Sequence, residues 1–209
     1  MTSSAEFWDR IAERYARKPV ADEETYQRKL AITRDYLQPE MELFEFGCGT
    51  GSTAIAHAPY VRRIEAIDIS PKMIEIARRK SAEANIDNVN FSVASIEQFE
   101  PADEGYDVVL GLSILHLVAD KEEIIGRVYR MLKPGGVFVT STACIGDAQR
   151  YLRFMVPLGR LLGLMPLVKV FTTDKLVKAM TDGGFAIDQQ WSPGENKAVF
   201  IVARKTEQE

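Results

Sequence analysis

The chain has 209 residues, of which 46% are hydrophobic and 27% charged, so we expect one globular domain rather than a disordered chain. Its 26 basic and 30 acidic residues leave a net charge of −4, whereas a protein that binds nucleic acid normally has an excess of lysine and arginine. Two cysteines and two histidines are too few for a disulfide framework or a four-ligand zinc centre, and no metal site is predicted.

The N-terminal part of the chain, residues 1–39, reads as two helical stretches before the first strand. They cover 4–18 and 21–37 and are separated near Pro19. The first residues lack the apolar core of a secretory signal, and no run of 18 apolar residues occurs in the sequence. We therefore predict a cytoplasmic protein with no membrane-spanning helix.

Strand-like and helix-like segments alternate through the middle of the chain. Apolar or β-branched runs of strand length lie at 41–47, 63–69, 88–94, 106–113 and 136–142. Ser70 followed by Pro71 is typical of a helix N-terminus. Asp120 with Glu123 marks the start of another helix, which we expect to end at 133–136. This alternation predicts βαβ crossovers and a mainly parallel sheet with helices on both faces.

The pattern changes after the fifth strand. Residues 147–171 form a long apolar stretch with interspersed basic residues, which we interpret as a helical lid inserted in the domain. A helix over 172–184 follows, and then two strands at 185–191 and 197–204. The short turn at 192–194 predicts that these two strands pair antiparallel.

Three glycines after the first strand are the strongest functional signal in the chain. Gly47, Gly49 and Gly51 are spaced so that the strand can turn sharply and its backbone can approach a ligand closely. Asp68, at the end of the second strand, can accept hydrogen bonds from ribose hydroxyls. Together they predict a site for a nucleoside cofactor. A dinucleotide fingerprint would have its third glycine where this chain has Ser52, which disfavours a nicotinamide cofactor.

Several further segments are similar, in order, to the motifs of one enzyme family. Glu45 and the three glycines form an E-x-G-x-G-x-G pattern, and EAIDIS follows at the second strand. YDVVLGLSILHLV and MLKPGGVFVTST lie around the fourth and fifth strands, and FTTDKLVKAMTDGGFAI follows them. FWDRIAERYA near the N-terminus resembles a cover helix of the family's small-molecule branch. Over most of 7–205, the chain resembles the class I S-adenosylmethionine-dependent methyltransferases.

The resemblance implies a Rossmann-like α/β fold for a single methyltransferase domain over 1–209. Its seven-stranded, mainly parallel sheet would have the order 3-2-1-4-5-7-6, with strand 7 antiparallel and helices on both faces. The helices in 1–39 would form an N-terminal cover, and 147–171 would form the lid.

The resemblance also implies the cofactor S-adenosylmethionine, its product S-adenosylhomocysteine and the residues that bind them. The three glycines would line the methionyl part, Asp68 would hold the ribose, and Ile69 would lie against the adenine. Ser95 stands where the family often has an acidic residue that meets the adenine amino group. The residues expected at the cofactor are Tyr15, Glu45, Gly47, Cys48, Gly49, Gly51, Asp68, Ile69, Met73, Ser95, Ile96 and Leu112.

Methyl transfer requires a positioned acceptor and, for a neutral hydroxyl or an acidic carbon, a general base. His116 after the fourth strand is the best candidate for this base, with simple packing as the alternative. Trp8 and Tyr15 are candidates for contact with the substrate or cofactor. The alternative is that Phe7, Ile11 and Tyr15, spaced at i, i+4 and i+8, form only a buried helical stripe. The fourth-strand region lacks the [D/N/S]-P-P-[Y/F] loop of enzymes that methylate adenine or glutamine amides, which favours a small-molecule acceptor.

The stretch 147–171 is the expected acceptor pocket. Phe154, Met155 and Leu158 would line it and would favour a partly apolar acceptor. With its interspersed arginines, the same stretch is also compatible with peripheral contact with an anionic membrane. Two further alternatives stay open: a nicotinamide-dependent oxidoreductase, and a non-catalytic cofactor-binding or membrane-surface protein. No oligomeric state is predicted.

Overall fold

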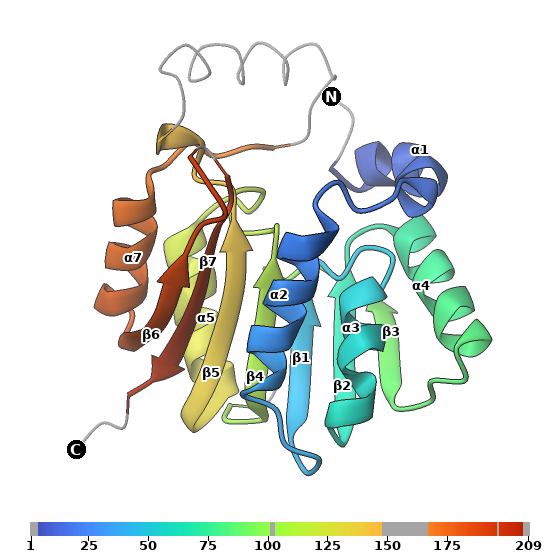
Figure 1. The fold of residues 1–209 in the computed structure, drawn as a ribbon, viewed down its shortest axis with the longest axis horizontal. Coiled ribbons are helices and arrows are strands. Elements are labelled where there is room, and N and C mark those ends of the chain that lie inside the picture. Colours follow the sequence, from blue (N-terminus) through green and yellow to red (C-terminus); the bar gives the residue numbers. More distant parts are fainter. Residues whose placement is uncertain (1–3, 101–102, 148–166, 196, 207–209) are drawn as a thin grey trace.

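A computed structural model of the chain describes residues 4–100, 103–147, 167–195 and 197–206. Helices alternate with the strands of a single sheet (Figure 1). The helices are α1 (Ser4–Arg17), α2 (Glu23–Arg34), α3 (Ser52–His57), α4 (Pro71–Glu83), α5 (Lys121–Met131) and α7 (Thr173–Asp182), with short 3-10 turns η1 (Ala58–Tyr60) and η2 (Ile145–Asp147). The strands are β1 (Glu42–Phe46), β2 (Arg63–Asp68), β3 (Val89–Val93), β4 (Tyr106–Leu112), β5 (Leu132–Thr142), β6 (Phe185–Trp191) and β7 (Val199–Lys205).

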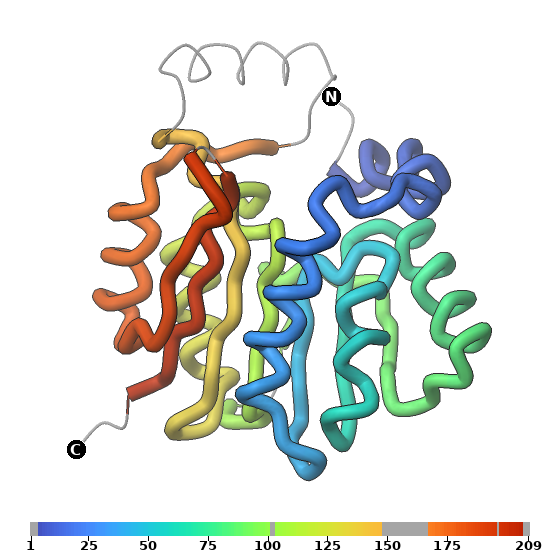
Figure 2. The backbone as a smooth tube through the Cα atoms, in the orientation of Figure 1, coloured from blue at the N-terminus to red at the C-terminus, as the bar shows by residue number. Residues whose placement is uncertain are grey.

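The sheet has the order β3-β2-β1-β4-β5-β7-β6. β1 pairs in parallel with β2 and β4, β2 with β3, and β4 with β5. β7 is antiparallel to both of its neighbours, β5 and β6. In Figure 2 the first half of the chain builds one side of the sheet and the second half the other. The predicted fold class and strand order are therefore confirmed.

Apolar side chains cover both faces of the sheet. Neighbouring residues of β1 point to opposite faces, and both Leu43 and Phe44 are 0% exposed. Leu43 belongs to a cluster with residues of α3 and α4, including Ala54. Phe44 belongs to the cluster on the other face, with residues of α5 and α7 such as Leu176. This two-sided burial holds the ends of the parallel strands in fixed positions.

The end of α5 differs from the sequence prediction. The helix was expected to run to 133–136, but it ends at Met131. Leu132 is extended, with φ −78° and ψ 138°, and it pairs with Tyr106 of β4. Lys133 precedes a proline, which disfavours the helical conformation. Strand β5 therefore begins four residues before the predicted strand at 136–142.

Side-chain caps fix the start of the helix that follows β2. As predicted, Ser70 caps α4, and its Oγ accepts a hydrogen bond from the Met73 backbone N–H at 3.1 Å. The Ser70 hydroxyl in turn donates to Asp9 of α1 at 2.5 Å, and the same carboxylate oxygen accepts from the Lys72 N–H at 3.0 Å. Ala12 of α1 is buried against Met73 and Ile76. Helix α1 is thus docked on the N-terminal part of α4.

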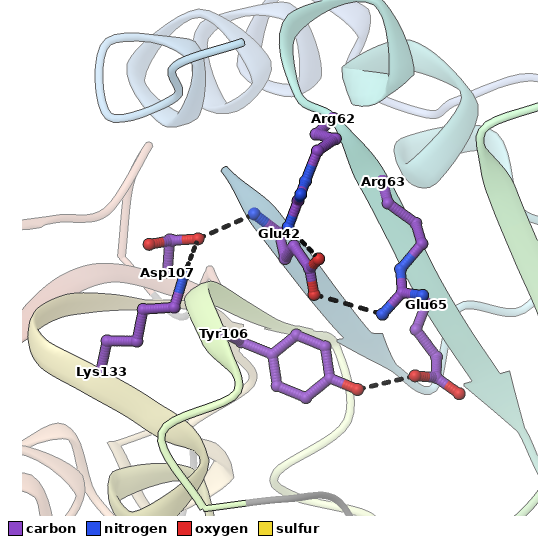
Figure 3. A network of polar contacts seen from close by, with 7 residues as sticks. All are labelled: Glu42, Arg62, Arg63, Glu65, Tyr106, Asp107 and Lys133. Carbon is purple, nitrogen blue, oxygen red and sulfur yellow. Dashed lines mark hydrogen bonds and ion pairs between the residues drawn. The ribbon is translucent and has the colours of Figure 1, made fainter. Parts of the chain in front are cut away.

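A polar network lies at the amino-terminal ends of the parallel strands (Figure 3). Glu42 at the start of β1 forms ion pairs with Arg62 and Arg63. Its backbone N–H donates to Asp107 Oδ2 at 2.8 Å, and Lys133 Nζ is 2.7 Å from the same oxygen. These contacts join the starts of β1, β2, β4 and β5. We expect the functional site at the opposite, carboxyl-terminal edge of the sheet, because ligands bind there in sheets of this kind.

Two further predictions concern the lid and a membrane-spanning helix. Most of the expected lid, including Phe154, Met155 and Leu158, lies outside the described residues, so the helical lid stays a prediction. No helix in the described part of the chain is both long and apolar enough to cross a membrane.

Candidate functional site

The three glycines of the loop after β1 all have positive φ angles, of 67°, 53° and 75°. A Cβ at Gly47 would lie 2.8 Å from Ile114, and one at Gly51 would lie 2.8 Å from Ala77 and from the Phe91 ring. A Cβ at Gly49 would have no atom within 4 Å. The outer glycines are therefore needed for packing, whereas the middle one faces open space.

Asp68 at the end of β2 is bonded to this loop. Its Oδ2 accepts from the Gly49 N–H at 2.9 Å, and its Oδ1 accepts from the Ser70 N–H at 2.9 Å. Burial raises the pKa of Asp68, and these backbone hydrogen bonds act in the opposite direction. Each carboxylate oxygen has a second lone pair. Asp68 can therefore accept further hydrogen bonds from a ligand beside Gly49.

A pocket at the carboxyl-terminal edge of the sheet contains both groups. It holds about 890 Å³ of space, its open mouth included, and its wall is mostly apolar. The predicted residues that line it are Trp8, Tyr15, Gly47, Gly49, Asp68, Ile69, Met73, Ile96 and Leu112. The structure thus brings together the loop, the carboxylate after β2, the segment after β3, the end of β4 and helix α1.

Other predicted residues are not part of the pocket wall. Glu45, Cys48, Gly51, Ser95 and His116 do not line it. The backbone carbonyl of Ser95 accepts from the N–H groups of Gln98 and Phe99, and so forms a turn.

Glu45 lies behind the glycine loop and is 2% exposed. Its Oε2 is buried without a hydrogen-bond partner among the described residues. Burial, reinforced by the nearby charge of Asp68, raises the pKa of Glu45 to about 8. Burial likewise raises the pKa of the Cys48 thiol well above its usual value. Cys48 is therefore a neutral thiol at neutral pH and no activated nucleophile.

His116 is half-buried in the loop between β4 and α5. Burial lowers its pKa, so its imidazole is neutral at neutral pH. Its Nδ1 is buried without a partner in the described part of the chain, and its carbonyl accepts from the Lys169 N–H at 2.8 Å. The ring is in a protonation state suited to a base but does not line the pocket.

Helix α1 supplies the aromatic side of the pocket. The rings of Trp8 and Tyr15 meet edge to face, with 6.3 Å between their centroids. Both residues line the pocket. The alternative, a buried stripe of Phe7, Ile11 and Tyr15, does not fit Tyr15, which is 52% exposed.

Half of the pocket wall was not predicted from the sequence. The additional residues are Ser4, Phe46, Ala94, Glu97, Ser113, Ile114, Leu117, Val118 and Leu167. Ser113 and Ile114 follow directly after β4, where the carboxyl end of a parallel strand is a recognisable signal. Glu97 brings an acidic side chain to the pocket two residues after Ser95. No group of three or more His, Cys, Asp or Glu in the described ranges is arranged to hold a metal ion.

Known proteins share the sequence pattern. A family model described as a methyltransferase domain matches residues 37–194 of the chain. The chain is 28% identical over 110 residues to an uncharacterised methyltransferase, YcgJ of Bacillus subtilis, a match that covers 53% of this chain and 44% of YcgJ. It is 27% identical over 164 residues to a ubiquinone biosynthesis O-methyltransferase of Methylobacterium, which covers 74% of this chain and 65% of that protein. In these sequence matches, the chain spans less than two thirds of the length of either relative.

Solved structures share the fold. YcgJ of Bacillus subtilis superposes with a TM-score of 0.74 at 19% identity, covering 87% of this chain and 100% of that chain. A geranyl diphosphate C-methyltransferase of Streptomyces coelicolor gives a TM-score of 0.71 at 16% identity, covering 86% and 78%. The family match covers most of the sheet, and the glycine loop and Asp68 lie within it. The chain therefore belongs to the class I S-adenosylmethionine-dependent methyltransferases.

Proposed function

We propose that this protein is a cytoplasmic enzyme that transfers the methyl group of S-adenosylmethionine to a small, partly apolar acceptor. One observation carries the proposal: Gly49 leaves open space at the point where its N–H is bonded to Asp68. If the loop served only as a turn, other side chains of the protein could occupy this space. The open space instead suits a ligand that approaches the backbone closely.

The residues of the pocket fit the parts of S-adenosylmethionine. Asp68 would accept hydrogen bonds from the ribose hydroxyls, and Gly47 and Gly49 would lie along the methionyl part. Ile69, Met73 and Ile96 would form the apolar surface against the adenine. Glu97, rather than Ser95, has the acidic side chain that would meet the adenine amino group. Glu45, Cys48 and Gly51 would act by shaping the loop from behind.

S-adenosylmethionine supplies a methyl group that is already activated on a sulfonium. The chain's own residues then have to orient the acceptor and exclude water. Trp8, Leu117 and Leu167 would form an apolar wall for the acceptor. Phe154, Met155 and Leu158 of the lid would extend it. A general-base role for His116 requires its ring to reach the pocket when the acceptor is bound.

The printed names of several relatives support an acceptor other than nucleic acid. The chain resembles enzymes of ubiquinone biosynthesis and a malonyl-[acyl-carrier protein] O-methyltransferase of Serratia marcescens, to which it is 28% identical over 111 residues. The structure of the geranyl diphosphate C-methyltransferase contains geranyl diphosphate and S-adenosylhomocysteine. Of these names, those of the ubiquinone and geranyl diphosphate enzymes support a small-molecule acceptor.

Titration calorimetry with S-adenosylhomocysteine tests the cofactor site. The Asp68→Ala variant should bind it about 10- to 150-fold more weakly, because hydrogen bonds to a charged acceptor contribute about 1.5–3 kcal/mol. The matched control is Asp188→Ala, which removes an ion pair with Arg204 on β7. Thermal unfolding of both variants checks that they are folded.

The remaining alternatives predict different results in the same experiments. Binding of NAD in preference to S-adenosylhomocysteine would indicate the oxidoreductase instead. Binding of S-adenosylhomocysteine without turnover across a panel of small hydroxyl, amine and carboxylic acid acceptors would indicate the non-catalytic protein. Sedimentation with anionic liposomes that weakens as salt rises would identify peripheral membrane contact.

A further inference from the structure

Lys29 of α2 is a half-buried cation at the carboxyl-terminal edge of the sheet. Its Nζ donates a hydrogen bond to Ser141 Oγ at 2.8 Å. Ser141 is the penultimate residue of β5 and is 2% exposed. Burial lowers the pKa of Lys29, because a half-buried ammonium is solvated less well than an exposed one.

Among the described residues, no carboxylate lies within ion-pair distance of this ammonium. Asp22, the N-cap of α2, raises the pKa of Lys29 only through a longer-range interaction, and Lys197 acts on the same carboxylate. The sequence of 148–166 contains no Asp or Glu. The ammonium has three N–H donors, and only the Ser141 hydroxyl accepts from it among the described residues. Partial burial of such a charge costs free energy, which an anion bound beside it would offset.

The ammonium lies beside the wall of the pocket. Ser141 pairs in register with Leu112 of β4, so their side chains project on the same face of the sheet at a spacing of about 5 Å. Leu112 lines the pocket. The next residue, Ser113, also lines it, and its N–H donates to the Ser141 carbonyl at 2.7 Å. Lys29 is therefore bonded to a residue of β5 whose partner on β4, Leu112, lines the space where the acceptor would bind.

Building on the methyl transfer proposed above, we propose that the acceptor carries an oxyanion, a carboxylate or a phosphate, and that Lys29 binds it at the rim of the pocket. Ser141 holds the ammonium in position. The apolar part of the acceptor packs against Ile114 and Leu117. Lys29 is then the residue that selects anionic acceptors over neutral ones of the same shape.

Calorimetry on the protein saturated with S-adenosylhomocysteine tests this selection. The probes are nonanoate, octyl phosphate and octanol, which share one octyl chain and differ in the head group. We expect at least one of the two anions to bind about tenfold tighter than octanol, or more, and the tighter one identifies the head group. Lys29→Met should remove the preference, whereas Lys29→Arg should keep most of it. The matched control is Lys178→Met, since Lys178 forms an exposed ion pair with Asp182 on α7.

The possible results distinguish a failure of the proposed function from a failure of the proposed role of Lys29. A wild-type protein that does not bind S-adenosylhomocysteine would refute the proposed function, and the role of Lys29 with it. Normal binding of S-adenosylhomocysteine with no preference for either anion would overturn the role of Lys29 alone. The same holds for a folded Lys29→Met variant that keeps the preference. If Lys29→Met does not fold, the polar Lys29→Gln variant replaces it in the same titration.

Discussion

Replacing Glu45 by glutamine should make the stability of the cofactor-free protein less dependent on pH. The carboxyl is buried behind the glycine loop, and its Oε2 has no hydrogen-bond partner among the described residues. Burial, with a contribution from Asp68, raises its pKa from 4.5 to about 8. Glutamine keeps the size of the side chain and an acceptor for the Ala54 N–H but cannot ionise.

The pKa fixes the sign and the size of the effect. A group whose pKa is higher in the folded protein stabilises the fold fully below its unfolded pKa, here 4.5, and this stability is lost as the pH rises through about 8. Between about pH 6.5 and pH 9 the loss is about 2 kcal/mol of the free energy of unfolding. For a chain of this length it corresponds to a fall in melting temperature of about 4–8 °C.

Thermal unfolding followed by circular dichroism measures this difference. Wild type and Glu45→Gln are compared across the same pH range, so that the contributions of other titrating groups cancel. The control is Glu75→Gln, an exposed carboxyl whose pKa is lowered by Lys72 and which is ionised throughout this range. A variant whose melting temperature falls as steeply as that of wild type would show that Glu45 is not held uncharged.

Two further predictions concern the loop and the helix after it. Gly51→Ala should destabilise the fold by about 2–5 kcal/mol, because its Cβ would lie 2.8 Å from the Phe91 ring at a φ of 75°. Gly49→Ala should cost only about 1–2 kcal/mol but should weaken S-adenosylhomocysteine binding, and equal melting temperatures of the two variants would contradict this contrast. Burial lowers the pKa of His57 to about 4, so its neutral form stabilises the fold above pH 6.5 and that stability is lost as the pH falls towards 4. His57→Leu should remove about 3 kcal/mol of this loss, measured by unfolding at a series of acidic pH values, and an unchanged acid dependence would refute it.

The sequence predicted the elements well where a local signal exists. Ser70 and Asp120 were predicted as helix caps, and both side chains accept the expected backbone hydrogen bonds. The predicted end of α5 was wrong because Pro134, Gly135 and Gly136 were interpreted as the residues that stop the helix, whereas they lie within β5. Only the pairing of Leu132 with Tyr106, 26 residues earlier, shows that the strand already begins there.

The site was predictable where it depends on residues that follow a strand directly. Gly49 and Asp68 are examples, since the ends of parallel strands meet at one edge. The burial of a side chain could not be predicted in this way. The sequence shows that Glu45 is acidic, but not that its carboxyl is buried without a hydrogen-bond partner among the described residues. The contact between Lys29 and Ser141 joins residues 112 positions apart and has no local signal at all.

The docking of α1 has a consequence for the timing of the reaction. Asp9 of this helix accepts hydrogen bonds from the N-terminal turn of α4, and Trp8, the residue before it, lines the pocket. Movement of α1 away from the pocket would break both hydrogen bonds of Asp9 and expose Ala12 and Met73 to water. Opening on this side would therefore cost these hydrogen bonds and this apolar burial together. A spent cofactor that left on this side would have to wait for this opening, however fast the methyl group is transferred.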